Sequence, residues 1–285
     1  MQGVSMQDED RKGVCEVCIH HCRLDEGQLG RCKARGMRQG DSTCVNYAKV
    51  TSIALDPIEK KPLRKFYPGS KILSIGSFGC NLSCPFCQNH SISMKGEEES
   101  VCETLLPGDA ARMAQNLINE GNIGLAYTYN EPLIGYEYVR DTAMEVRRLG
   151  MKNVVVTNGC FTEKVAGEVL PFIDALNIDL KSFHEKTYRL LGGDLETVKK
   201  FIMLAYAEAH IELTTLVVPG LNDTEEEMEA LTGWVASIDP AIVLHISRFF
   251  PAWHMEQENP TEVRAVYRLA EIARRKLHNV YEGNC

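Results

Sequence analysis

Short runs of aliphatic and β-branched residues alternate with longer amphipathic stretches through most of the chain. The short runs predict strands, and apolar residues three or four positions apart predict helices between them. Strands that alternate with helices are typical of parallel βαβ units, and six units are too few to close an eight-stranded barrel. The expected strands cover residues 72–75, 123–127, 153–157, 175–178, 211–217 and 242–246, and the expected helices lie near 109–120, 133–149, 163–170, 184–209, 223–237 and 262–277.

The first 68 residues follow a different pattern. They are rich in cysteine, glycine and charge, with little helical periodicity before the turn-like Tyr67-Pro68-Gly69. We therefore predict an α/β protein in two parts. Residues 1–68 form a small Cys-rich N-terminal metal-binding segment, and residues 69–285 form a partial (βα)6 TIM-like barrel, with an open sheet as the alternative.

Composition and charge narrow the class of protein. The 285 residues are 44% hydrophobic and 25% charged, which is ordinary for a globular protein. The net charge of −8 argues against a general nucleic-acid binder, which needs a basic face. No apolar run is long enough to span a membrane and the N-terminus is polar, so we expect a cytoplasmic protein. In a reducing compartment its eleven cysteines indicate metal ligands or catalytic groups and not disulfides.

Three cysteines directly follow the first predicted strand. Cys80, Cys84 and Cys87 have the spacing C-x3-C-x2-C on a short loop, so their thiolates can converge on one iron–sulfur cluster. A cubane cluster normally takes four thiolates, and a set of three leaves one iron open to bind a substrate or cofactor. The alternatives are a zinc site completed by His90 or a distant cysteine, or three buried thiols.

The segment CNLSCPFC resembles the signature of the radical S-adenosylmethionine (SAM) superfamily. The wider stretch DPIEKKPLRKFYPGSKILSIGSFGCNLSCPFCQNHSIS resembles the AmmeMemoRadiSam-system radical SAM enzymes, which are relatives of pyruvate formate-lyase activating enzymes. The resemblance implies an oxidoreductase in which the three cysteines hold a [4Fe-4S] cluster and SAM chelates its fourth iron. Reductive cleavage of SAM then gives a 5′-deoxyadenosyl radical that abstracts hydrogen from a substrate. It also implies a reductant of the flavodoxin or ferredoxin type, and a protein substrate if the enzyme is a glycyl-radical activase.

The resemblance also implies residues that bind SAM. Phe86, beside the last cysteine, is placed to contact adenine. Glu131 follows Tyr129-Asn130 where the superfamily usually has two glycines, and it matches the carboxylate that binds the SAM ammonium. Asn158 resembles a residue that faces the pocket in related enzymes. A core aromatic residue, a turn carboxylate and an Asn-Gly turn are the structural alternatives.

Two later strand ends carry further candidates. Asp179 and Lys181 match a D-L-K element near the SAM ribose and carboxylate, and they alternate onto one side of an extended segment. His245 resembles a position that faces SAM. Arg248 would serve the substrate or the SAM carboxylate only if the chain turns after the sixth strand. An ion pair at a strand end and a core histidine are the alternatives.

The N-terminal segment has its own set of four soft ligands. Cys15, Cys18, Cys22 and Cys32 fall within eighteen residues, a spacing that suits structural zinc or an all-cysteine iron–sulfur cluster. The segment has few apolar residues, so metal binding would supply its folding energy. If the barrel were a degenerate scaffold, the chain would instead be a metal-binding interaction protein with a zinc-ribbon-like head.

Overall fold

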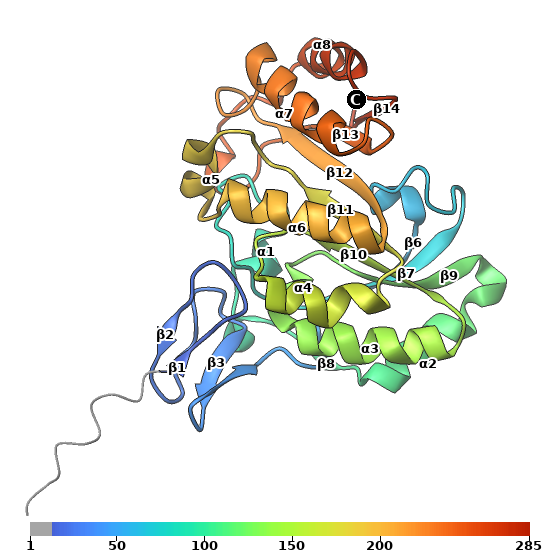
Figure 1. The fold of residues 1–285 in the computed structure, drawn as a ribbon. Coiled ribbons are helices and arrows are strands. Elements are labelled where there is room, and N and C mark those ends of the chain that lie inside the picture. The colour runs from blue at the N-terminus through green and yellow to red at the C-terminus, as the bar shows by residue number, and fades with distance from the viewer. Residues whose placement is uncertain (1–12) are drawn as a thin grey trace, which may run out of the picture.

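The computed structural model describes residues 13–285, and its largest element is a sheet of eight strands (Figure 1). The strand order is β14-β13-β12-β11-β10-β9-β7-β6. All six predicted strands are present, and successive ones pair in parallel. The prediction of an α/β partial barrel is therefore confirmed. The six strands are β7 (Lys71–Gly76), β9 (Asn122–Tyr127), β10 (Lys152–Thr157), β11 (Ala175–Asp179), β12 (His210–Val217) and β13 (Val243–Arg248).

Two strands that the sequence does not predict form the edges of the sheet. β14 (Asn279–Gly283) runs parallel to β13, and β6 (Ser52–Pro57) runs antiparallel to β7. β6 lies inside the predicted N-terminal segment of residues 1–68, of which residues 1–12 lie outside the described part. β6 pairs with β7 along its whole length, so residues 52–57 are part of the main sheet.

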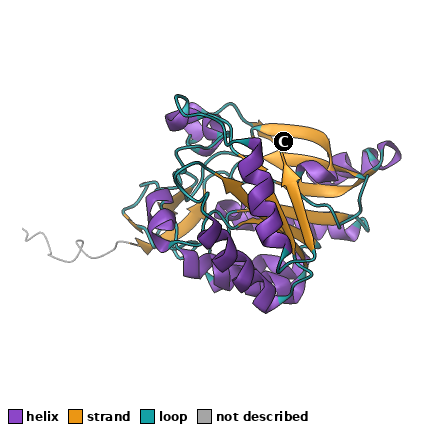
Figure 2. Cartoon of the chain, turned by 90° about the horizontal axis from the view of Figure 1, so that it is seen from above, coloured by secondary structure: helices purple, strands orange, loops and turns teal. Residues whose placement is uncertain are grey.

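Helices pack along one face of the sheet in chain order, as Figures 1 and 2 show. The predicted helix over 184–209 is two helices, because Gly192 has a φ of +76° and ends the first one. No helix among the described residues has the length and apolar content to cross a membrane. The α-helices are α1 (His90–Ser93), α2 (Pro107–Asn116), α3 (Tyr136–Arg148), α4 (Glu163–Val169), α5 (Glu185–Leu191), α6 (Leu195–Glu208), α7 (Glu225–Ile238) and α8 (Val263–Arg274).

The connection from β6 to β7 folds into the interior of the partial barrel. Ile58 and Leu63 are fully buried there, and the Asn177 side chain donates to the Pro62 carbonyl oxygen at 2.9 Å. Inward-facing residues of a strand alternate, so Ala175, Asn177 and Asp179 lie on one side of β11. The connection therefore fills the part of the interior near the amino ends of the strands, and it leaves the carboxyl ends open. The apolar residues packed around Ile58 and Leu63 are Ile72, Ala126, Val154 and Ala175.

Residues 13–50 form a small head made of short strand pairs. β1 (Gly13–Val14) pairs with β2 (Arg23–Leu24), and β3 (Arg35–Arg38) pairs with β4 (Asp41–Cys44), both antiparallel. The last head strand, β5 (Lys49–Val50), pairs with β8 (Glu103–Thr104). In Figure 1 the head, in dark blue, lies beside α1, which follows the cysteine triplet.

Candidate functional site

The carboxyl ends of the strands surround a cavity of about 340 Å³. Its volume lies at the lower end of the range for small-molecule sites. It brings together eight of the ten residues that the sequence proposes for the cluster and SAM. These eight are Cys80, Cys84, Phe86, Cys87, Glu131, Asn158, Asp179 and Lys181.

The loop after β7 places the three cysteines on one wall of this cavity. It turns at Gly79, which has a φ of +87° and whose Cβ would lie 2.4 Å from the Cys32 carbonyl oxygen. No other residue is accommodated there without a shift of the backbone. The Leu82 amide donates to the Cys80 sulfur at 3.3 Å, and the Asn158 amide group lies 3.8 Å from the same sulfur.

Burial favours the protonated form of two of these thiols in the absence of a cation. It raises the pKa of Cys80 well above its usual range, and it raises the pKa of Cys84 to about 11 although Lys181 opposes the rise. Metal ligation requires the thiolate, so iron must supply the positive charge that holds these sulfurs in their ionised form. Three soft ligands on one loop beside an open cavity suit a cluster with one free iron.

The arrangement does not favour a single zinc ion at the triplet. Among residues 13–285, no three histidine, cysteine or acidic side chains approach closely enough to hold one metal ion. His90, the proposed fourth zinc ligand, has its Nδ1 3.2 Å from the Cys87 carbonyl oxygen and its ring stacked on Trp253. The ligands of a cubane cluster surround a cube and need not converge on one point.

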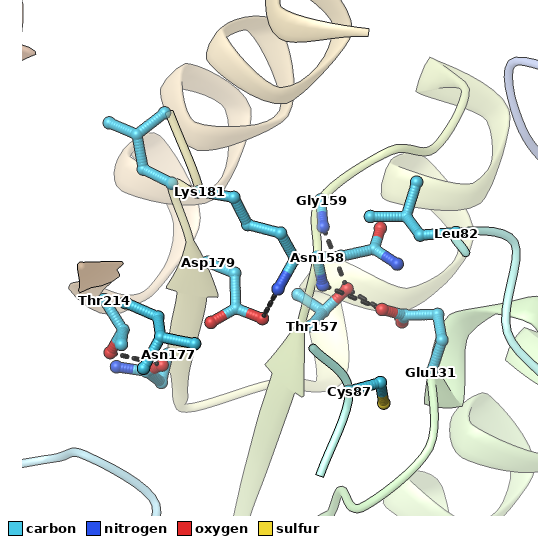
Figure 3. A network of polar contacts seen from close by, with 12 residues as sticks. Leu82, Cys87, Glu131, Thr157, Asn158, Gly159, Asn177, Asp179, Lys181 and Thr214 are labelled. Carbon is cyan, nitrogen blue, oxygen red and sulfur yellow. Dashed lines mark hydrogen bonds and ion pairs between the residues drawn. The ribbon is translucent and has the colours of Figure 1, made fainter. Parts of the chain in front are cut away.

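Glu131 is a buried carboxylate held in one orientation (Figure 3). It begins the 3-10 turn Pro132–Gly135, and its Oε1 accepts from the Leu133 amide at 3.1 Å and from Thr157 Oγ1 at 2.8 Å. Its Oε2 accepts from the Asn158 amide at 2.7 Å. Burial raises the pKa of Glu131 to about 7, although these three donors act against the rise. A bound cation beside it would favour the ionised form.

Asp179 and Lys181 form an ion pair across the same cavity from Glu131 (Figure 3). Lys181 Nζ lies 2.7 Å from Asp179 Oδ2. Burial favours the neutral amine, but the Asp179 carboxylate outweighs it and raises the pKa of Lys181 above its usual value. The cavity therefore presents an ammonium group and two carboxylates around one small volume.

The structure does not bring His245 or Arg248 to the cavity. The inward-facing residue between them, Ser247, lines it instead. His245 lies one inward position deeper, where its Nε2 is 2.6 Å from Glu212 Oε2. Arg248 alternates onto the other side of β13, and its Nε donates to the Thr261 carbonyl oxygen at 2.6 Å.

A network that the sequence analysis missed supports the Glu131 loop. Tyr129 adopts a φ of +73°, a conformation that favours glycine, and its hydroxyl donates to Asp56 Oδ2 at 2.7 Å. The buried Lys61 ammonium lies 2.8 Å from the same oxygen and 4.6 Å from the centre of the Tyr129 ring. The signal was present: Asp56 and Lys61 belong to the DPIEKKPL run, and Tyr129 stands where the superfamily has a glycine.

A second missed residue fixes Asn158 beside the cysteine loop. The fully buried Asn81 accepts from Asn158 Nδ2 at 2.8 Å and donates to the Cys160 carbonyl oxygen at 3.0 Å. Asn81 lies directly after the first cysteine of the triplet, so its side chain joins that loop to the end of β10. The only available signal was its place inside CNLSCPFC.

A partial barrel with a three-cysteine loop beside a small-molecule cavity is typical of an iron–sulfur enzyme that binds a cofactor at its cluster. The sequence profile of the Radical SAM superfamily matches residues 74–235, more than half of the chain. The chain belongs to this superfamily. The prediction of a [4Fe-4S] cluster and SAM as cofactors is thereby confirmed, and an enzyme is supported over an interaction protein.

Individual relatives agree with this membership. An uncharacterized protein of Methanocaldococcus jannaschii is 35% identical over 279 residues, which cover 97% of this chain and 82% of the relative. SuiB of Streptococcus suis shares the fold with a TM-score of 0.57 and 14% identity, over 74% of this chain and 48% of that one. The structure of TYW1 with a lysine–pyruvate adduct bound gives 0.54 and 16%, over 79% and 83%. The narrower AmmeMemoRadiSam resemblance stays a prediction.

Proposed function

We propose that this enzyme binds its [4Fe-4S] cluster through Cys80, Cys84 and Cys87 and binds SAM in the adjoining cavity. When bound and reduced, the cluster would supply the electron for the cleavage of SAM, and the bound SAM would supply the radical chemistry that abstracts hydrogen from the substrate. The observation that carries the proposal is that the three cysteines, Glu131 and Lys181 line one cavity. The geometry and charge of that cavity support the role that we propose for each residue.

Glu131 binds the SAM ammonium. Its carboxylate is buried, ordered by three donors and raised in pKa, so a cation is the partner that its surroundings lack. Lys181 binds the SAM carboxylate through an ammonium that Asp179 already holds in place. Asp179 retains Oδ1 for the ribose hydroxyls, and Phe86 contacts the adenine ring from the cysteine loop.

The Glu131 loop and the cysteine loop are tied together, which fixes the ammonium site relative to the cluster. Asn130 accepts from the Ser77 amide at 2.9 Å and donates to the carbonyl oxygens of Phe78 and Gly79, each at 3.1 Å. Asn89 donates to the Tyr129 carbonyl oxygen at 2.7 Å. These hydrogen bonds fix the backbone at Tyr129 and Asn130, where the superfamily usually has two glycines. A backbone that is ordered before the cofactor binds can position that cofactor accurately.

The reductant that we propose is a one-electron carrier of the flavodoxin or ferredoxin type, because the cluster accepts single electrons. The glycyl-radical activase function stays a prediction. Neither His245 nor Arg248 has a role in the proposed SAM site, because each is engaged elsewhere.

Electron paramagnetic resonance of the reduced, reconstituted protein tests this proposal. Because one iron is open, addition of SAM should change the spectrum of the cluster. The Lys181→Ala variant should need more SAM for the same change, while Cys102→Ala, whose side chain does not line the cavity, should behave as wild type. A spectrum that SAM leaves unchanged at saturating concentration would contradict the placement of SAM.

A further inference from the structure

We propose that Cys15, Cys18, Cys22 and Cys32 hold a second iron–sulfur cluster, packed directly on the loop that carries the first. The metal site in the head does not depend on where SAM binds, whereas its role in electron transfer rests on the proposed function. Cys15, Cys18 and Cys32 are 4%, 7% and 6% exposed, and Cys22 is half-buried. Four cysteines gathered in a unit of fewer than forty residues are the ligand set of an all-cysteine cluster.

The head brings these four side chains into one neighbourhood. Cys15 and Cys22 face each other across the β1–β2 pair, where the Cys15 amide donates to the Cys22 carbonyl oxygen at 3.0 Å. The Cys22 sulfur lies against Gly30, two residues before Cys32, where a Cβ would be 3.6 Å from it. Residues as far apart in the chain as Cys15 and Cys32 therefore converge on one small region of the head.

The catalytic triplet is the reference for the head cysteines. Within residues 13–285, neither the head cysteines nor the catalytic triplet approach closely enough to hold a single ion. The triplet belongs to a superfamily that binds a cubane, so it provides an internal reference for this wider arrangement. The head has one more cysteine than the triplet. Its cluster would therefore be fully ligated, with no open iron for SAM.

The head touches the catalytic loop at three points. The Cys32 carbonyl oxygen lies against Gly79, where it leaves no room for a side chain. His20 Nε2 lies 2.8 Å from the Asn81 carbonyl oxygen, and Arg31 Nη2 donates to Ser83 Oγ at 3.0 Å. A fourth contact, the bridge between Cys18 and Phe161, joins the head to the chain after β10.

These contacts give the second cluster a role in electron transfer. A cluster held by these cysteines would accept one electron from the flavodoxin- or ferredoxin-type carrier. It would return to its oxidised state by passing that electron to the catalytic cluster. No bond is made or broken in this step, and a complete set of cysteine ligands suits it. Cys22 is the most exposed of the four, so an electron would enter on its side.

Metal analysis of the full chain tests the proposal. The Cys80→Ala/Cys84→Ala/Cys87→Ala variant, reconstituted with iron and sulfide, should retain iron and sulfide in equal amounts. Further replacement of Cys18 and Cys32 by alanine should remove both. Reduced wild-type protein should show two resonance signals, of which SAM changes only one, because the head cluster has no open iron.

Cys285→Ser is the matched control, since this exposed thiol lies outside both groups and its loss should change no metal content. Wild-type protein should hold more iron than the roughly four atoms of one cubane. This count decides the matter even if the triplet variant does not fold. Zinc without sulfide in the head, or wild-type iron that stops at one cubane, would overturn the proposal.

Discussion

Replacement of Glu131 by glutamine should weaken SAM binding without changing the iron content. The variant keeps the size of the side chain, and the amide oxygen still accepts from two of the three donors around it. It removes the negative charge that we propose as the partner of the SAM ammonium. It also leaves the Asn158 backbone amide facing the NH2 group of the glutamine. A hydrogen bond to a charged group contributes about 1.5 to 3 kcal/mol. The dissociation constant should therefore rise about ten- to hundredfold.

The pH dependence of SAM binding provides a second test of Glu131. Its pKa of about 7 in the free protein means that it loses its charge as the pH falls below neutrality. An ammonium ligand binds the ionised form, so wild-type affinity should fall by up to about tenfold per pH unit below 7 and level off above it. The glutamine variant should lack this slope.

The same pKa predicts an effect on folding. In the folded protein without SAM, the pKa of Glu131 is raised above the ordinary 4.5. Between pH 4.5 and about 7 the folded protein therefore binds more protons at this site than the unfolded chain does. Without SAM, stability should therefore fall as the pH rises through this window, by up to about 3 kcal/mol, and the glutamine variant should not show this decline. Denaturant unfolding at several pH values measures it.

Anaerobic calorimetry of SAM binding at pH 6, 7 and 8 measures the affinities. The matched control is Glu196→Gln, which makes the same chemical change on an exposed helix position. Wild-type affinity in the Glu131 variant, or the same pH slope in both proteins, would refute the assignment of Glu131 to the SAM ammonium.

Three further predictions concern residues around the cavity. Lys181→Ala should weaken SAM binding by about 1.5 to 3 kcal/mol while iron content stays at the wild-type level, as calorimetry and iron analysis of the same samples would show. Lys61→Met leaves the Asp56 carboxylate buried with weaker partners and should lower the free energy of unfolding by about 1.5 to 3 kcal/mol in denaturant titrations; unchanged stability would contradict this. Four donors hold the pKa of Glu212 at about 2, against the effect of burial. The Glu212 carboxylate should therefore add up to about 3 kcal/mol to the free energy of unfolding above pH 4.5, and this contribution should disappear as the pH falls toward 2. A Glu212→Gln variant with wild-type acid stability would exclude it.

The strands could be predicted because their sequences are continuous and apolar, which is typical of buried parallel strands. β6 was missed because Ser52–Pro57 is mixed in character and ends in an aspartate and a proline. The helix predicted over 184–209 reads as one amphipathic segment, and only the positive φ at Gly192 shows where it breaks. Local pattern identified these elements, whereas an edge strand depends on its distant partner.

The residues of the candidate site could likewise be predicted only in part. Cys80, Cys84, Cys87 and Glu131 lie in short motifs, and the structure brings them to one cavity. His245 could not be placed from sequence because its partner Glu212 lies on the neighbouring strand, thirty-three residues away. The bracing of Tyr129 likewise depends on Asp56, which is distant in the chain. Interactions between distant segments therefore determined which motif residues reach the cavity.

The most direct test of the account is whether the reduced protein cleaves SAM. Reconstituted protein should be incubated anaerobically with dithionite and SAM, and the products separated by chromatography. We expect 5′-deoxyadenosine and methionine in equal amounts, formed slowly even without substrate, and neither product above background in the Cys80→Ala/Cys84→Ala/Cys87→Ala variant. A wild-type protein that contains its cluster but forms no more 5′-deoxyadenosine than this variant would contradict the account.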